Sequence, residues 1–180
     1  MNWVDGVFIV VLALFTAAGA WQGVFRQTMG FLTFLLGLIF ASYFRELPEG
    51  FIRFFFPASS AAAVESISFV GVFAVSVVVL ATIARISFPV TRFQGLWVFD
   101  QFFGGLVSAL TTGLQFGLAA FLLQYLDLTW LGSTELGQTV VAGIEMSALT
   151  PFSQAAVVAL ATLFTPGIPG GLPNFFVLFA

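Results

Sequence analysis

The chain has no cysteine, no histidine and no lysine, and only 7% of its 180 residues are charged. Without cysteine it has no disulfide framework, no thiol chemistry and no thiolate metal site. Without histidine it lacks the usual general base and the commonest transition-metal ligand. The sequence also offers no nucleophile–base pair and no phosphate-binding loop, and its net charge of −3 argues against nucleic-acid binding. We therefore expect no enzymatic activity, no metal, no cofactor and no nucleic-acid partner.

What the sequence does contain is apolar. Hydrophobic residues make up 60% of the chain, and Phe alone occurs 25 times. A soluble domain carries roughly 25% charged residues, far more than this chain. A helix that crosses a bilayer needs about 20 mostly apolar residues. Four stretches meet this requirement, at residues 4–24, 27–44, 64–84 and 99–125. The sequence thus predicts an all-α integral membrane protein with four transmembrane helices in the lipid bilayer.

The first stretch is expected to stay in the protein as a transmembrane helix. Ala18, Gly19 and Ala20 resemble a signal-peptide cleavage site. A signal peptide, however, begins with a positive region, and the only early charge here is the acidic Asp5. The apolar stretch also continues beyond Ala20.

A four-helix transmembrane domain over residues 1–127 is expected to precede a tail over residues 128–180. Apolar residues recur every four positions over 136–144, which predicts a short helix with one apolar face. A second helix is expected over 151–165, ended by Pro166; at about 22 Å it is too short for an upright span. We expect two interfacial or re-entrant helices, and a fifth crossing remains an open alternative.

The arginines set the expected orientation. Arg26 lies between the first two stretches, and Arg85 and Arg92 lie between the third and fourth. Arg45 and Arg53 fall in the opposite loop, accompanied by two glutamates, and the tail has no arginine. Positive residues favour the cytoplasmic side. Both termini, and with them the tail, are therefore expected on the extracytoplasmic side.

Two segments of the sequence resemble the colicin V production protein family, the CvpA-like membrane proteins. They are the opening "MNWVDGVFIVVLALFTAAGAWQGVFRQTMGFL" and the later "GLWVFDQFFGGLVSAL". The resemblance covers about residues 1–126. It implies a four-helix protein of the bacterial inner membrane, with family roles in toxin secretion, envelope homeostasis and biofilm formation. Some relatives carry a serine protease domain after the fourth helix, outside the cytoplasm.

The chain keeps some polar positions of that family and has lost others. The positions that match are Gly23, Arg26, Gly95, Asp100 and Gly104. Glutamine stands where the family has charged residues at three positions, Gln22, Gln27 and Gln101. A later Arg-Gly pair of the family is replaced by Thr111-Thr112. Any family activity that depends on the lost charges is in doubt for this chain.

Asp100 opens the fourth apolar stretch, where an unpaired charge would be costly. We expect a structural cap at the cytoplasmic start of that helix, within salt-bridge reach of Arg26, Arg85 or Arg92. These four residues form the expected polar cluster. A proton or ion site and a partner-binding site are the alternatives.

Small residues recur every fourth position along the fourth stretch, at Gly105, Ala109, Gly113 and Gly117. Small side chains let helices approach closely in lipid, where van der Waals packing replaces the hydrophobic drive. The stripe predicts packing within the bundle, so Gly113→Leu should disrupt it; a seam for another subunit is the alternative. Gly19 and Gly23 of the first stretch, and Gly30 and Gly37 of the second, are candidate facing surfaces.

Four phenylalanines cluster in the expected outer loop: Phe51, Phe54, Phe55 and Phe56. They are typical of an interfacial aromatic belt, although Trp and Tyr are commoner there. The alternative is a surface for a membrane partner, a bound lipid or a pigment.

The expected function is that of a noncatalytic scaffold or accessory subunit that packs against other integral membrane proteins. A charge-depleted apolar surface suits this role. The alternative is a transporter or secretion-related component, for colicin V production-like export or for passage of a small solute or ion. A transporter normally carries ionisable or discontinuous polar elements at mid-depth. The first three stretches offer only hydroxyl groups there: Thr16, Thr33, Ser68 and Ser76.

Overall fold

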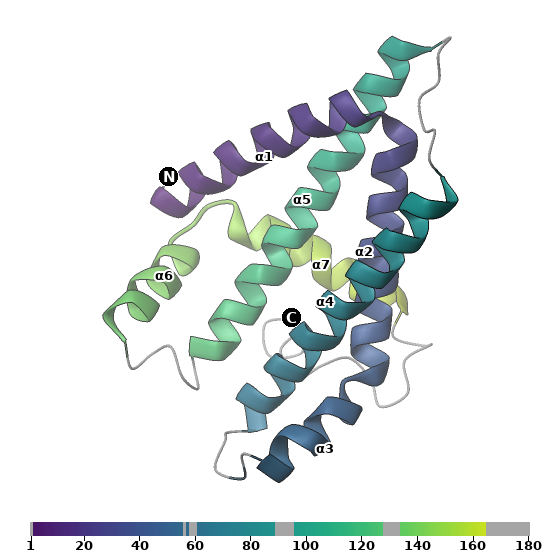
Figure 1. Cartoon of the computed structure of the whole chain (residues 1–180). Helices are drawn as coiled ribbons and strands as arrows, with labels where there is room; N and C mark the ends of the chain where they lie inside the picture. Colours follow the sequence, from purple (N-terminus) through teal and green to yellow (C-terminus); the bar gives the residue numbers. More distant parts are fainter. Residues whose placement is uncertain (1, 56, 58–60, 89–95, 128–133, 165–180) are drawn as a thin grey trace.

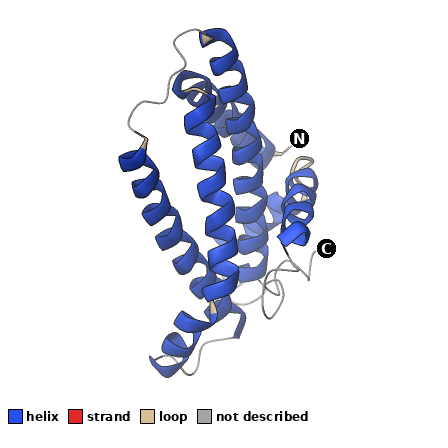
Figure 2. Cartoon of the chain, turned by 90° about the vertical axis from the view of Figure 1, so that its right-hand side faces the viewer, coloured by secondary structure: helices blue, strands red, loops and turns tan. Residues whose placement is uncertain are grey.

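A computed structural model describes residues 2–55, 57, 61–88, 96–127 and 134–164. In this part of the chain every regular element is a helix, and no strand is present (Figures 1 and 2). The helices are α1 (Trp3–Gln22), α2 (Val24–Phe44), α3 (Glu46–Phe55), α4 (Ala61–Ser87), α5 (Trp97–Asp127), α6 (Glu135–Glu145) and α7 (Thr150–Phe164).

Four of these helices are long and apolar enough to cross a membrane: α1, α2, α4 and α5. The two helices of the tail, α6 and α7, meet at an angle of 81°. The predicted fold class, four transmembrane helices followed by a pair of short helices, is thereby confirmed. The bent pair has the length of one broken span or of a re-entrant loop, so the number of crossings is four or five.

The helix boundaries differ from the expected ones at the first turn. Gly23 alone separates α1 from α2, with φ of 87° and ψ of 161°. Only glycine adopts this backbone conformation without strain. Arg26, expected in the turn between the first two helices, therefore lies in the first turn of α2. The expected outer loop is likewise a helix, α3, which begins directly after Arg45.

α5 is the central helix of the bundle. α1, α2, α6 and α7 all pack on it, whereas α4 packs chiefly on α2 and α3. Figure 1 shows α1 running obliquely across α5 towards the end of the bundle where α2 begins. This arrangement brings the α1–α2 turn against the start of α5.

The main hydrophobic core draws on α2, α4, α5 and α7. Phe69 and Phe121 are fully buried in it, and Val157 of α7 packs with them. The other buried members are Phe34, Leu38, Ala41, Leu114, Leu118, Tyr125 and Ala161. The tail helix α7 therefore shares one core with the transmembrane helices.

Candidate functional site

Asp100 lies where the α1–α2 turn meets α5. It is 7% exposed, and its Oδ1 accepts a hydrogen bond from the backbone N–H of Val24 at 2.9 Å. Val24 is the first residue of α2, and Gly23 before it has no side chain that could cap the helix. The first N–H groups of a helix lack partners within it and carry its positive dipole end. The Asp100 carboxylate therefore caps α2 from a neighbouring helix.

This geometry corrects the expected role of Asp100 in two respects. It does not cap its own helix: α5 begins at Trp97, and the Asp100 N–H already donates to the Leu96 carbonyl at 2.9 Å. Among the described residues Asp100 also has no salt bridge to Arg26 or Arg85. The carboxylate instead lies against Gly23, and its Oδ1 accepts from the Val24 N–H. The fourth member of the expected cluster, Arg92, lies outside the described residues.

Small residues make this approach possible. A Cβ added to Gly23 would meet the Asp100 carboxylate, and one added to Gly104 would lie 2.7 Å from the Gly19 carbonyl oxygen. One turn further along α5, the Ser108 hydroxyl donates to the Phe15 carbonyl at 2.7 Å. Gly19 and Gly23, expected as facing surfaces, thus lie against α5, and a Cβ added to Gly19 would meet the Ser108 side chain even more closely than one added to Gly104 would meet α1.

The stripe predicted on α5 is not one continuous seam. Gly105 contacts α1, where an added Cβ would lie 3.5 Å from the Ala20 Cβ, and Ala109 is half-buried. Gly117 contacts α7 instead, and an added Cβ would meet the Ser153 carbonyl. At Gly113 an added Cβ meets nothing within 4 Å. The prediction that Gly113 is a tight packing position is therefore wrong.

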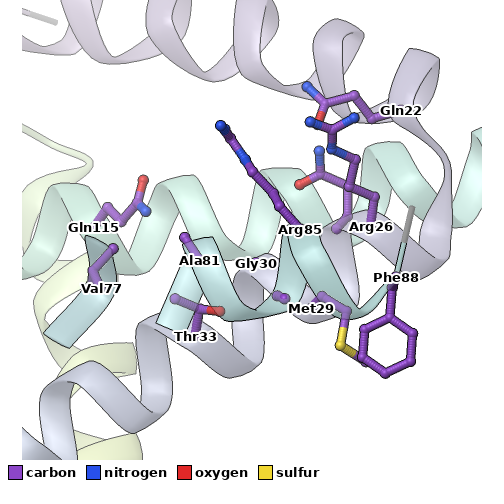
Figure 3. A pocket seen from close by; sticks show the side chains of 12 residues that line it. Gln22, Arg26, Met29, Gly30, Thr33, Val77, Ala81, Arg85, Phe88 and Gln115 are labelled. Atoms are coloured by element: carbon purple, nitrogen blue, oxygen red, sulfur yellow. The ribbon is translucent and has the colours of Figure 1, made fainter. Parts of the chain in front are cut away.

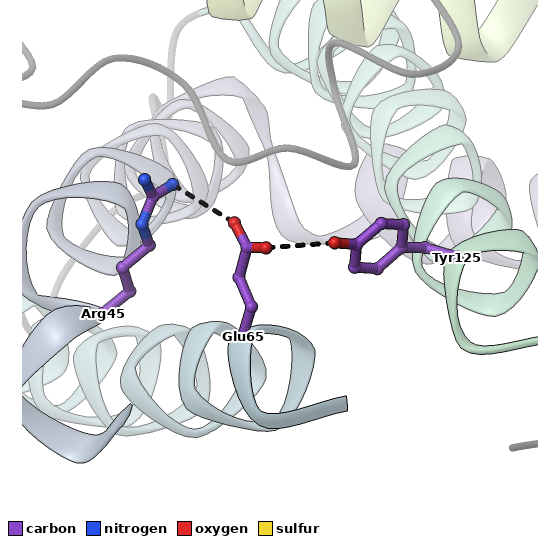
Figure 4. Close-up of polar contacts among 3 residues, drawn as sticks. All are labelled: Arg45, Glu65 and Tyr125. Carbon is purple, nitrogen blue, oxygen red and sulfur yellow. Dashed lines mark hydrogen bonds and ion pairs between the residues drawn. The ribbon is translucent and has the colours of Figure 1, made fainter. Parts of the chain in front are cut away.

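A second polar cluster, which sequence reasoning missed, lies at the opposite end of the bundle. Glu65 of α4 pairs with Arg45 at 3.7 Å and accepts a hydrogen bond from the Tyr125 hydroxyl at 3.1 Å (Figure 4). Glu65 is the only acidic residue between Glu49 and Asp100, and that isolation was the signal available in the sequence. Burial, reinforced by the charge of Glu65, raises the pKa of Glu49 on the neighbouring helix α3.

Asp5 forms a third buried polar contact and ties the tail to α1. Its carboxylate accepts hydrogen bonds from the Ser147 hydroxyl at 2.6 Å and from the Leu149 N–H at 3.3 Å. The Ser147 hydroxyl oxygen in turn accepts from the Thr150 N–H at 3.2 Å, at the start of α7. Asp5 also accepts from the Asn2 N–H at 2.8 Å. One carboxylate thus joins the starts of α1 and α7.

The other two members of the expected cluster, Arg26 and Arg85, line a pocket of about 610 Å³ together with Gln22, Gln27 and Gln115. In Figure 3 the Arg26 and Arg85 side chains both extend towards α1. Within the described part of the chain neither guanidinium has a hydrogen bond or a salt bridge. The structure thus separates the expected cluster into a capping carboxylate and a pocket with two arginines.

The expected phenylalanine cluster lies on the short helix α3. Phe51, Phe54 and Phe55 are 69%, 79% and 57% exposed, and Phe55 contacts the rings of the other two. Phe56 lies outside the described residues. The three described rings form one exposed aromatic patch beside the spans.

No group of three His, Cys, Asp or Glu side chains able to hold a metal occurs among the described residues.

Comparisons with known proteins place the chain in a family. Searches of curated proteins and of solved structures found no match. The family described as "Colicin V production protein" matches residues 4–163, most of the chain and both helices of the tail. The matched range includes the Gly23–Asp100 contact, and the chain is a member of the colicin V production protein family.

Proposed function

We propose that this family member is a noncatalytic scaffold or accessory subunit that packs against other integral membrane proteins. The observation that carries the proposal is the set of partners bound by the buried acids of the described residues, Asp5, Glu65 and Asp100. Each is bound to a helix start or to side chains of neighbouring helices. Groups with these partners hold the bundle together and are poorly placed to act as a general base or an ion relay.

The surface proposed to meet a partner is the outer face of α4. Only 11% of the most apolar part of this span is buried inside the chain, against 39% for α5. Val75, Val78 and Ile83 are more than half exposed, and an added Cβ at Gly71 meets nothing within 4 Å. This face of α4 consists of β-branched side chains with open space at Gly71. Such a surface would allow a helix of a partner protein to pack closely against α4 in the bilayer.

Site-specific photo-crosslinking in native membranes tests this proposal. A photoreactive residue at Val75 or Val78 should give one discrete protein adduct. The same residue at Leu106 or Leu110, exposed positions on α5, is the matched control and should give only lipid adducts. Lipid adducts alone at Val75 and Val78, with a chain that is monomeric in native nanodiscs, would contradict the proposal.

We also propose a bacterial inner-membrane location with both termini on the extracytoplasmic side. Arg26 and Arg85 lie at one end of the spans, where positive residues favour the cytoplasm. A cysteine added after Ala180 should react with a membrane-impermeant maleimide in intact spheroplasts. Reaction only after the cytoplasmic face is opened would reverse this orientation.

A secretion-related role is the second candidate, and the family match favours it. Under this role the chain would support export of a peptide toxin or passage of a small solute. Loss of export on deletion of the gene, with a normal oligomeric state of all other envelope complexes, would favour this role over the scaffold.

A further inference from the structure

The pocket that contains Arg26 and Arg85 has the charge of an anion site. Two guanidinium groups line it, and none of its twelve lining residues is acidic. The nearby carboxylate of Asp100 is not among them and is bound to the Val24 N–H. Both arginines are exposed and lack protein partners within the described residues. Arginine presents a planar set of N–H donors that matches phosphate oxygens.

The pocket continues from the arginines into the apolar part of the bundle. Arg26 and Thr33 both line it, seven residues or about 10 Å apart along α2. Arg85 and Val77, about 12 Å apart along α4, form the opposite wall. Gly30, which also lines the pocket, is exposed and leaves open space where a side chain would stand. The site is therefore charged at the end of the spans, and farther along it is lined by the apolar Val77 and Ala81 together with the polar Thr33 and Gln115.

We propose that this pocket binds an anionic phospholipid. Arg26 and Arg85 hold the phosphate, Gln22 and Gln27 offer hydrogen bonds to the headgroup, and Gly30 leaves room for the start of an acyl chain. The volume of about 610 Å³ is within the range of ligand sites and far beyond that of a single water. Basic pockets between transmembrane helices are suited to anionic headgroups, which are plentiful in the cytoplasmic leaflet.

The first test measures lipid binding to the purified full-length chain by native mass spectrometry. The probes are dioleoylphosphatidylglycerol and dioleoylphosphatidylcholine, which share their acyl chains and differ in charge. The anionic lipid should bind at least about tenfold more tightly: both lipids carry a phosphate, but only phosphatidylcholine also carries a quaternary ammonium, which two arginines repel. Arg26→Gln and Arg85→Gln should each weaken it by about tenfold, and the double variant should lose the preference.

Arg53→Gln is the matched control. Arg53 is an exposed arginine on α3 and does not line the pocket, so this variant loses the same charge elsewhere. Its lipid preference should stay that of the parent. Equal loss in Arg53→Gln, or unchanged binding in the double variant, would overturn the proposal. The Arg26 and Arg85 variants should keep the parent's thermal midpoint, because the described residues give these two side chains no hydrogen bond or ion pair.

A second experiment distinguishes a lipid ligand from a soluble phosphate in this pocket. Gly30→Leu fills the open space beside Gly30 without changing charge, and should weaken phosphatidylglycerol binding by about tenfold or more. Inorganic phosphate and glycerol 3-phosphate at millimolar concentration should not displace the lipid. If either displaces it, or if Gly30→Leu binds the lipid as the parent does, the pocket is a soluble-anion site and the lipid assignment is wrong.

Discussion

Replacing Asp100 tests whether a carboxylate on α5 holds the start of α2. The contact to remove is one hydrogen bond of 2.9 Å to the Val24 N–H. Asp100→Leu leaves this N–H without an acceptor, which costs about 1–3 kcal/mol of unfolding free energy. Loss of the favourable charge at the helix start adds about 0.3–1 kcal/mol. Asp100→Asn keeps an oxygen acceptor and should cost no more than about 1 kcal/mol.

Gly23 supplies the second half of this test. Gly23→Ala forces a side chain into a backbone conformation that is essentially restricted to glycine, at a cost of about 1–3 kcal/mol. Its new methyl group would also meet the Asp100 carboxylate. In an Asp100→Ala background that contact is gone and only the backbone strain remains. The double variant should therefore be more stable than the sum of the two single effects predicts, by at least about 0.5 kcal/mol.

Unfolding in mixed micelles of mild detergent and sodium dodecyl sulfate, followed by far-UV circular dichroism, measures these differences. Glu145→Gln, which changes an exposed acid at the end of α6, is the control and should stay within about 0.5 kcal/mol of the parent. Equal stability of the Asn and Leu variants would refute the capping role. Strict additivity of Gly23→Ala and Asp100→Ala would refute the close contact.

Three other perturbations distinguish parts of the bundle. Gly117→Ala should destabilise the folded chain by about 1–3 kcal/mol, because the new methyl group would meet α7. Gly113→Ala should be neutral or should stabilise the chain by up to about 1 kcal/mol, and thermal midpoints in detergent compare the two variants. Ser147→Ala should speed amide hydrogen exchange in α7 and leave exchange in α2 unchanged. Because the folded-state pKa of Glu49 is raised above its ordinary 4.5, the folded state favours its neutral form, and stability should fall as pH rises from 4.5. Glu49→Gln should remove that part of the slope, and an identical slope in the variant would contradict the assignment.

Length and apolar composition were enough to predict the spans, because a bilayer imposes both on any helix that crosses it. The same reasoning could not place the α1–α2 boundary. Gly23 is one glycine among several in the sequence, and its importance comes from a positive φ that only the folded turn requires. Asp100 was conspicuous as a charge beside an apolar run. Its partner was not, because a backbone N–H leaves no trace in the sequence.

The error at Gly113 has a geometric cause. Four residues advance an α-helix by about 400°, so a stripe with this spacing turns by about 40° at each step. From Gly105 to Gly117 it turns by about 120°. One end of the stripe therefore faces α1 and the other faces α7, and Gly113 lies between these contacts. A shared spacing identified small residues on α5 but could not identify which helix each one meets.

The buried carboxylates show how a chain with so few charges specifies one bundle. In lipid the apolar side chains alone give helices little reason to choose one arrangement over another. Asp100 joins α5 to the start of α2, Glu65 joins α4 to Arg45 and Tyr125, and Asp5 joins α1 to the start of α7. Each bond links elements distant in sequence, and each would leave an unpaired polar group in an alternative packing, which is costly away from water. Arg26 and Arg85, by contrast, have no hydrogen bond or ion pair to any other described residue, which leaves their guanidinium groups available to a ligand from the bilayer.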